Sequence, residues 1–296
     1  MTGFSVGIKI LSELIEQVRF TLLIVQKREW GNNSVSSLAF DRAASYYGRT
    51  RGKPEFVSRA ITDSLIDLAR LTPASRVLEI GIGTGRIALP LLSRGLRVVG
   101  IDLSLAMMER IRDQIAPGAR VRLAQTDANA LPFPDTTFDC AYAVSVYHVV
   151  ANWQNALREA WRVVKPGGYF LVSYGYVDQR APYGVLHRQL AELAREYGIT
   201  PLTPGAQSQE EIRIELEQLG DPRVVEVVRW NDSVQPARVL DGLAARMVSE
   251  TWLIPDDAFT QIVPRLRSFV QATIGDLTRE VMQEERFEWI VINKRC

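Results

Sequence analysis

The sequence predicts an α/β fold built on a doubly wound, mostly parallel sheet. From about residue 72, short apolar runs rich in branched residues alternate with helix-length segments, which is the pattern of strands joined by helical crossovers. The first run ends in an acidic residue and continues into glycines at alternate positions. A chain of 296 residues with 47% hydrophobic composition is also long enough to bury a large core.

Seven strands follow one another along the chain. They are expected at Arg76–Ile80, Arg97–Asp102, Val121–Thr126, Phe138–Val144, Tyr169–Tyr174, Arg223–Trp230 and Phe287–Asn293. Between the first five lie segments of helix length, as right-handed crossovers require. The helices expected outside this alternation are Phe40–Tyr47, Glu55–Leu71, Pro182–Tyr197, Ser208–Leu219, Pro236–Ser249 and Asp256–Val281.

The glycine run is the most informative part of the chain. The strand before it, Val77–Ile80, has the branched apolar composition of a buried parallel strand. Gly81, Gly83 and Gly85 let the backbone turn sharply and approach a ligand where a Cβ atom would collide. The apolar residues that begin at Ile87 suit a helix whose N-terminus points at that ligand. The segment therefore predicts a site for a nucleotide-type cofactor.

Two registers of the glycine run predict different cofactors. Gly83–Ala88 fits the G-x-G-x-x-G/A pattern of dinucleotide-binding proteins, and Asp102 lies downstream at the end of the second strand. The glycines begin one step earlier, however, and Glu79–Gly85 reads E-x-G-x-G-x-G. This run resembles the first motif of the class I S-adenosylmethionine-dependent methyltransferases, which have a seven-stranded Rossmann-like fold. An NAD-dependent oxidoreductase is the disfavoured alternative.

Further segments carry the same resemblance. Val98–Ser104 is similar to that family's second strand, Thr126–Ala128 with Leu131–Phe133 to its adenine-contacting segment, Phe138–Asp139 to the start of its fourth strand and Val163–Gly168 to the loop before its fifth. The most similar subgroup is the type 11 domain family, which methylates quinones, lipids and other small molecules. The resemblance implies S-adenosylmethionine as cofactor and methyl transfer to a small-molecule acceptor by in-line displacement. A regulatory or partner protein that binds the cofactor without turnover is the alternative.

Three acidic residues are assigned to the cofactor through the resemblance. It implies that Asp102 holds the two ribose hydroxyls, since a carboxylate at the end of a strand can accept two hydrogen bonds. It places Glu79 near the methionine ammonium and lets Asp127 accept from the adenine amine. The structural alternatives are an N-cap for a helix that starts at Leu103, a loop-ordering acceptor at Glu79 and an Asx-turn at Asp127. The other cofactor-binding residues implied are Gly81, Gly83, Gly85, Leu103, Ala128 and Ser145.

Catalysis is expected to involve His148, in the loop after the fourth strand. An imidazole titrates near neutral pH and can accept the proton that a hydroxyl or acidic carbon loses on methylation. A structural histidine is the alternative. In several small-molecule methyltransferases of this type, a tyrosine from an N-terminal lid meets such a histidine, and Tyr46 and Tyr47 occupy the matching place. Candidates for the walls of an aromatic acceptor pocket, with core packing as the alternative, are Tyr46, Tyr47, Tyr147, Trp153 and Tyr183.

The N-terminus is expected to be a separate helical extension. Apolar residues at helical spacing run through Ile8–Val25, interrupted by charged residues, so the segment is neither a membrane span nor a signal-peptide core. Packing on the chain's own surface, a homodimer contact and a membrane-surface or disordered segment are its alternative roles. We divide the chain into this extension (1–35) and a methyltransferase domain (36–296). Within the domain lie lid helices (36–71), a cofactor-binding core (72–174), a helical insertion that covers the substrate (175–221) and C-terminal strands and helices (222–296).

Composition and charge limit the classes of molecule that the chain is expected to bind. The net charge of +1 supplies no field that would recruit nucleic acid, and the loop Ser145–His148 lacks the prolines found where base amino groups are methylated. Only two cysteines are present, Cys140 within a strand and Cys296 at the end, which predicts a reducing, cytoplasmic location. Two scattered histidines and two cysteines offer no metal site. We therefore expect a small-molecule acceptor, no nucleic acid, no membrane span and no metal.

Overall fold

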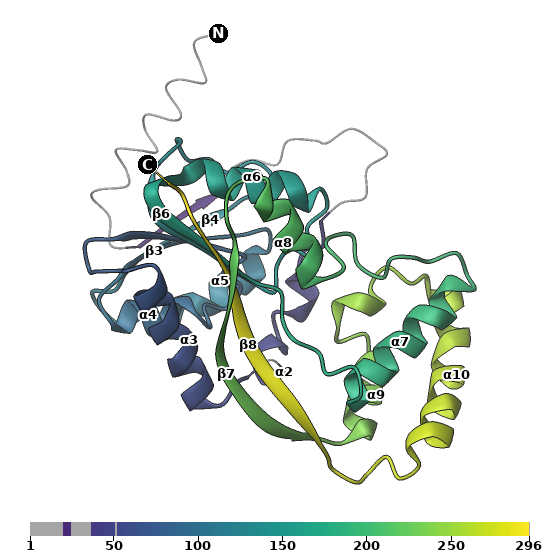
Figure 1. Cartoon of the computed structure of the whole chain (residues 1–296). Helices are drawn as coiled ribbons and strands as arrows, with labels where there is room; N and C mark the ends of the chain where they lie inside the picture. Colours follow the sequence, from purple (N-terminus) through teal and green to yellow (C-terminus); the bar gives the residue numbers. More distant parts are fainter. Residues whose placement is uncertain (1–19, 25–36, 51, 296) are drawn as a thin grey trace.

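The computed structural model of the chain describes residues 20–24, 37–50 and 52–295, and within them eight strands form one sheet (Figure 1). The strands are β1 (Phe20–Ile24), β2 (Arg76–Ile80), β3 (Arg97–Asp102), β4 (Arg120–Gln125), β5 (Phe138–Val144), β6 (Val164–Ser173), β7 (Arg223–Val234) and β8 (Val281–Asn293). Their order across the sheet is β1-β4-β3-β2-β5-β6-β8-β7. Neighbours from β1 to β6 are parallel, whereas β8 runs antiparallel to both β6 and β7. The predicted seven-stranded, mostly parallel sheet is confirmed in β2–β8.

The described helices are η1 (Asp41–Ala43), α2 (Tyr47–Thr50), α3 (Glu55–Leu68), α4 (Ala88–Ser93), α5 (Leu105–Arg112), α6 (Trp153–Val163), α7 (Pro182–Arg195), α8 (Gln209–Glu217), α9 (Pro236–Ala244), η2 (Ser249–Thr251) and α10 (Asp256–Ile274). Branched apolar residues alternate along the central strands, so each strand supplies side chains to both faces of the sheet. Helices α3, α4 and α5 bury one face, and α6 and α8 bury the other. This is the doubly wound arrangement.

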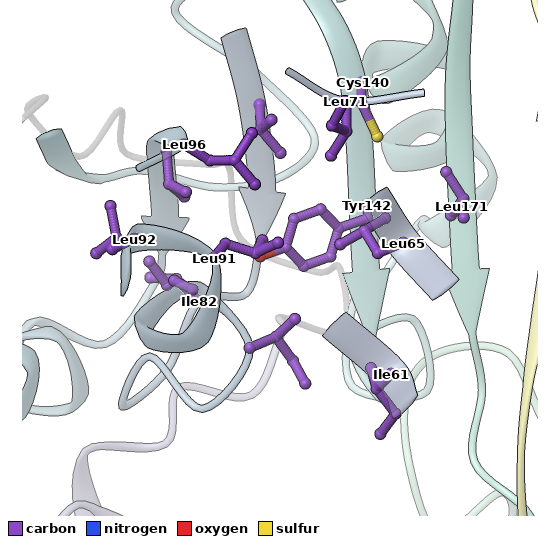
Figure 2. Packing of buried hydrophobic residues seen from close by; sticks show 14 of the residues in the cluster. Ile61, Leu65, Leu71, Ile82, Leu91, Leu92, Leu96, Cys140, Tyr142 and Leu171 are labelled. Atoms are coloured by element: carbon purple, nitrogen blue, oxygen red, sulfur yellow. The ribbon is translucent and has the colours of Figure 1, made fainter. Parts of the chain in front are cut away.

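The face under α3 and α4 is closely packed around Tyr142 (Figure 2). Its ring lies among Ile61 and Leu65 of α3 and Leu91 of α4, and all four side chains are buried. At the far edge of the same face, the indole Nε1 of Trp289 donates to Ser64 Oγ at 2.9 Å. A buried indole N–H needs such a partner, because leaving it unpaired would cost about 1–3 kcal/mol.

A third apolar cluster lies outside the sheet. Helices α7, α9 and α10 pack together around Leu190, Leu240, Ile262 and Leu266, all nearly inaccessible to solvent. In Figure 1 these helices stand to one side of the sheet, where the extended strands β7 and β8 lead to α9 and α10. β8 pairs with β6 only near its end, while its first part pairs with β7 alone. The two strands thus form a ribbon that carries the helical layer.

One predicted helix is wrong where the structure describes it. Phe20–Ile24, inside the helix expected over Ile8–Val25, is the strand β1, which pairs in parallel with β4 from Phe20↔Val121 to Ile24↔Gln125. The reason is that β4 would otherwise present an unpaired edge, and this segment has the aromatic and β-branched composition of a strand. The rest of the expected helix lies outside the described residues, as does any dimer contact made through it.

The lid segment also differs from its prediction. Phe40–Tyr47 was expected to be one helix, but it contains the single 3-10 turn η1 and meets α2 only at Tyr47. Before η1, the backbone runs beside the loop that follows β5: Leu38 N–H donates to Val149 O at 2.9 Å. Tertiary contacts of this kind override a local helix preference. We call Ser37–Ala43 the strap.

Candidate active site

The carboxyl ends of β2, β3, β4 and β5 open into one cavity. Parallel strands with crossovers on both faces leave such a crevice where the strand order reverses, here between β2 and β5. The cavity is lined by Ser37, Leu38, Phe40, Tyr47, Ile80, Gly81, Gly83, Ile101, Asp102, Leu103, Met107, Thr126, Asp127, Ala128, Val144, Ser145, Val146, Val149 and Val150. Eight of the twelve residues assigned from the sequence are among them: Tyr47, Gly81, Gly83, Asp102, Leu103, Asp127, Ala128 and Ser145.

Asp102 joins the glycine loop to the end of β3. Its Oδ2 accepts from Gly83 N–H and its Oδ1 from Ser104 N–H, both at 2.8 Å. Burial raises the pKa of Asp102 to about 6, against the lowering effect of those two bonds. The next helix, α5, begins at Leu105 and is capped by Ser104, so the alternative of Asp102 as N-cap of a helix from Leu103 does not hold. A carboxylate fixed by two N–H groups retains lone pairs for ligand hydroxyls.

The glycine loop has no room for a Cβ atom at Gly81 or Gly85. Gly81 has φ +70°, and a Cβ atom there would lie 2.4 Å from Val146 Cγ2. Gly85 has φ +79°, and a Cβ atom would lie 3.1 Å from Ile111 Cγ1. These positions lie in the left-handed region that only glycine adopts readily. The loop therefore brings bare backbone to the floor of the cavity, as a site for an extended cofactor requires.

Glu79 is buried and is not among the residues that line the cavity. Its Oε2 accepts from the hydroxyl of Tyr142, its neighbour on β5, at 2.8 Å. Burial raises the pKa of Glu79 to about 8, while Tyr142, Arg86 and the backbone of Ala88 act to lower it. These contacts match the loop-ordering alternative, because Ala88 begins the helix after the glycines. Contact with a methionine ammonium remains a proposal for Glu79, and neither Glu79 nor Gly85 lines the cavity.

Asp127 forms the predicted Asx-turn and also lines the cavity. Its Oδ1 accepts from Asn129 N–H at 2.9 Å and from Asn129 Nδ2 at 3.1 Å, which is the Asx-turn. The residue also lines the cavity beside Ala128, with Leu103 from the end of β3 in the same wall. Two apolar side chains and an acceptor at one end suit a flat heteroaromatic ring with an exocyclic amine.

The loop after β5 forms the opposite wall. Ser145 lines the cavity with a backbone φ of +55°, unusual for a residue other than glycine, and its N–H donates to Ser173 O at 2.7 Å. Gly205 and Ala206 hold the loop from behind: Gly205 N–H donates to His148 O and Ala206 N–H to Tyr147 O, both at 2.9 Å. A Cβ atom at Gly205 would lie 1.9 Å from Tyr147 O, so this backbone approach is specific to glycine.

The roof of the cavity comes from the strap and the residue that begins α2. Leu38, Phe40 and Tyr47 all line it, and the rings of Phe40 and Tyr47 meet edge to face at 6.0 Å. Tyr46 is half-buried and does not line the cavity. Of the two predicted lid tyrosines, the structure therefore brings only Tyr47 to the cofactor cavity.

His148 lies beside the cavity, and its neighbour Tyr174 was not predicted from the sequence. Its ring meets Tyr174 edge to face at 6.1 Å. Burial, then the carboxylates of Glu211 and Glu250, raise the pKa of Tyr174 above its usual range. Glu250 in turn accepts from the Tyr183 hydroxyl at 2.6 Å. We call His148, Tyr174, Tyr183 and Glu250 the His148 cluster.

The four residues of the His148 cluster come from the loop after β5, the end of β6, helix α7 and the turn η2. The ring of Trp252, just after η2, packs on Phe40 of the strap at 4.6 Å, which joins this side to the cofactor cavity. No local pattern marks Glu250 or Trp252, since their roles depend on segments about 67 and more residues away. Of the other predicted aromatic walls, Tyr147 is buried in the core and Trp153 packs against the same apolar cluster.

No helix among the described residues is long and apolar enough to cross a bilayer. In the same part of the chain, no three His, Cys, Asp or Glu side chains gather as metal ligands do.

Residues 78–172 match the family model described as a methyltransferase domain. The chain is 36% identical over 126 residues to the demethylmenaquinone methyltransferase of Thermus thermophilus, across 42% of this chain and 57% of the relative. It is 34% identical over 126 residues to the phosphatidylethanolamine N-methyltransferase of Cereibacter sphaeroides, across 42% and 62%. The alignments thus span little more than half of each relative.

A solved structure from Bacillus halodurans, assigned as a methyltransferase, has the same fold. It superimposes with a TM-score of 0.56 at 19% identity, over 79% of this chain and 99% of that one. The predicted motifs, the strand order and the family match all agree on the same domain. Residues 78–172 of this chain are therefore similar to the methyltransferase domain, and the relatives aligned with the chain are themselves named as methyltransferases.

Proposed function

We propose that this chain transfers a methyl group from S-adenosylmethionine to a small-molecule acceptor. The observation that carries the proposal is the junction of two sites: a cavity with a glycine floor and the Asp102 carboxylate, and the His148 cluster beside it. The first suits the cofactor, and the second offers side chains that can orient an acceptor and take up a proton.

The fit of the cofactor rests on the cavity's own chemistry. Asp102 would hold the ribose hydroxyls, and Asp127 with Leu103 and Ala128 would hold the adenine ring. Gly81 and Gly83 would let the methionine end approach the backbone, since a Cβ atom at Gly81 would fill space next to Val146. When bound, the cofactor supplies an activated methyl group on a sulfonium, so the protein needs to position the acceptor more than to activate it.

His148 is the proposed base. It follows β5, whose carboxyl end forms one wall of the cavity, and its ring is oriented by Tyr174. For an acceptor that loses a proton, His148 would take that proton onto a ring nitrogen. Tyr47, in the roof, would close over the bound cofactor and exclude water. These roles are proposals that the substitutions below test.

A small acceptor is favoured by what surrounds the His148 cluster. Tyr183 comes from α7, Glu250 from η2 and Trp252 packs on Phe40 of the strap, so this side of the molecule reaches the roof of the cofactor cavity. Aromatic rings beside one carboxylate suit a ring-bearing or amine-bearing molecule. The two relatives named above act by their names on demethylmenaquinone and on phosphatidylethanolamine, so quinols and ethanolamine derivatives are the first acceptors to test.

The test is turnover on a chemically broad panel. Purified protein with S-adenosylmethionine would be offered phenols, quinols, ethanolamine derivatives and carbon acids, and release of S-adenosylhomocysteine would be measured. We expect one class to give turnover above the rate without acceptor, and calorimetry to show binding of S-adenosylhomocysteine but not of NAD. Cofactor binding without turnover on any class would favour a regulatory protein, and NAD binding would contradict the proposal outright.

A further inference from the structure

The hydroxyl of Ser104 connects two distant parts of the chain. Ser104 is fully buried at the start of α5, where its Oγ accepts from Met107 N–H at 3.2 Å and so caps the helix. The same hydroxyl donates its proton to Asp41 Oδ1 at 2.6 Å. Asp41 belongs to the strap, 63 residues earlier, and is itself exposed. A short bond from a buried hydroxyl to a carboxylate is among the stronger hydrogen bonds in proteins.

Ser104 also touches the cofactor site. Its N–H donates to Asp102 Oδ1 at 2.8 Å, so one residue bonds both to the strap carboxylate and to the carboxylate that faces the cavity. The Asp41 charge is near enough to add to the burial that raises the pKa of Asp102. The position of Asp102 therefore depends on where Ser104 is held, and Ser104 is held in part by Asp41.

The strap is fixed on the other side of the cavity as well. Leu38 N–H donates to Val149 O at 2.9 Å, and Ala151 N–H donates to Ser37 Oγ at 3.1 Å. The strap thus spans from the loop after β5 to the start of α5. Between these two attachments, Ser37, Leu38 and Phe40 line the cavity. A ligand that fills the cavity meets the strap and Asp102 at once.

We propose that Asp41 is a positioning residue of the cofactor site: through Ser104 it aligns Asp102 and fastens the strap across the cavity. The bond closes the strap on the ribose side, while the contacts of Leu38 and Ser37 close it on the side of the β5 loop. Because a cofactor in this cavity would contact both the strap and Asp102, its binding and the fastening of the strap would strengthen each other by linkage. The inference rests on the cofactor assignment within the proposed function and not on the identity of the acceptor.

Three substitutions test it by titration with S-adenosylhomocysteine in a calorimeter. Asp41→Ala removes the acceptor of the Ser104 hydroxyl and should weaken binding about 5- to 30-fold. Asp41→Asn keeps an oxygen at Oδ1 and should restore most of the affinity, which a role of the charge alone would not allow. Asp113→Ala, at the opposite end of α5 on an exposed aspartate, is the matched control and should bind as the wild type does.

Hydrogen exchange supplies the second measurement. Bound S-adenosylhomocysteine should slow exchange in the strap of the wild type, where Leu38 N–H is hydrogen-bonded, and should slow it much less in Asp41→Ala. Asp41 is exposed, so its truncation opens no cavity, and equal melting temperatures of the free proteins would show that the fold is intact. If Asp41→Ala keeps both wild-type affinity and wild-type protection of the strap, the role of Asp41 is overturned while the proposed function stands. A wild type that does not bind S-adenosylhomocysteine would overturn the proposed function with it.

Discussion

The cofactor cavity and the His148 cluster lie side by side but are built in different ways. Apart from its roof, the cavity is made by backbone and by residues at the ends of adjacent parallel strands, from the end of β2 to the loop after β5. The His148 cluster is made by side chains from four elements, including Glu250 from η2, which belongs to the helical layer. The cavity thus follows from local sequence and sheet topology. The cluster depends on how a separate helical layer is placed.

The difference separates a common cofactor site from an individual acceptor site. The helical layer has its own apolar cluster in α7, α9 and α10, and the β7–β8 ribbon carries it. Such a layer can change its side chains without disturbing the glycine loop. We therefore expect the effects of substitutions on the two sides to be separable. Substitutions around the cofactor cavity should alter cofactor affinity, whereas those in the His148 cluster or the helical layer should alter turnover or stability without altering cofactor affinity.

The largest effect is expected from His148→Ala. Loss of a general base should lower kcat about 10²- to 10⁴-fold, while affinity for S-adenosylhomocysteine stays nearly unchanged because His148 does not line the cofactor cavity. Steady-state kinetics on the acceptor found by the panel, with calorimetry on the same variant, makes the measurement. The comparison is His187→Ala, which replaces the other histidine of the chain and should lower kcat by less than about tenfold. Normal turnover in His148→Ala would return the residue to a structural role.

Core substitutions test whether the two sides are separable. Leu266→Ala in α10 and Leu91→Ala in α4 each remove a buried leucine side chain, so each should lower the free energy of unfolding by about 2–5 kcal/mol. Only Leu91 belongs to the helix that follows the glycine loop. At a temperature where both variants are folded, only Leu91→Ala should weaken S-adenosylhomocysteine binding. Equal losses of affinity would show that the helical layer and the cofactor cavity are one cooperative structure.

The same division explains what the sequence could predict. The strand Phe138–Val144 has the bounds that its apolar composition predicts. Parallel strands are buried on both faces of the sheet, so a run of apolar residues is enough to mark them. The residues Asp102 and Ala128 line the cavity as expected, since the ends of parallel strands meet at one edge. Short-range pattern and topology together were sufficient for the strand ends that line the cavity.

Prediction failed where distant segments decide the structure. Phe20–Ile24 has apolar spacing compatible with a helix, but the free edge of β4 makes it a strand. Asp41 and Glu250 act through Ser104 and Tyr183, bonds that span 63 and 67 residues. The sequence offers no periodicity that relates such partners. Gly205 is similar: only the folded chain reveals that its backbone lies against the loop of His148.

The Asp102 carboxylate gives the next effect in size, confined to the cofactor side. Asp102→Ala should weaken S-adenosylhomocysteine binding about 10- to 100-fold, from the loss of roughly 1.5–3 kcal/mol of charged hydrogen bonds to the ribose. Calorimetry measures this, and circular dichroism checks that the variant is folded. Wild-type affinity in a folded variant would remove Asp102 from the ribose site.

A smaller effect is expected from pH. The pKa of Asp102 is raised to about 6 by burial, so ribose binding must displace a proton below that pH, and affinity should fall up to tenfold for each pH unit below about 6. The sign for stability is opposite: a carboxyl with a raised folded pKa stabilises the free protein at low pH, and this stabilisation is lost as pH rises through about 6. Burial raises the pKa of Glu79 to about 8, so Glu79 titrates at a higher pH than Asp102 does. Calorimetric titrations from pH 5 to 8 should show the fall in affinity in the wild type and a flatter profile in Asp102→Asn; equal profiles would contradict the assignment.

The smallest effect, and the one of opposite sign, concerns a glycine of the helical layer. Gly242 lies within α9, has no positive φ, and a Cβ atom there would meet nothing within 4 Å. Gly242→Ala should therefore raise the free energy of unfolding by about 0.5–1 kcal/mol, because alanine loses less backbone entropy in a helix. Gly81→Ala is the matched substitution on the cofactor side, where a φ of +70° and a contact at 2.4 Å make the same change unfavourable. Denaturant unfolding should show the gain for Gly242→Ala with unchanged turnover and cofactor affinity, and a loss of affinity there would mean that α9 is coupled to the cavity after all.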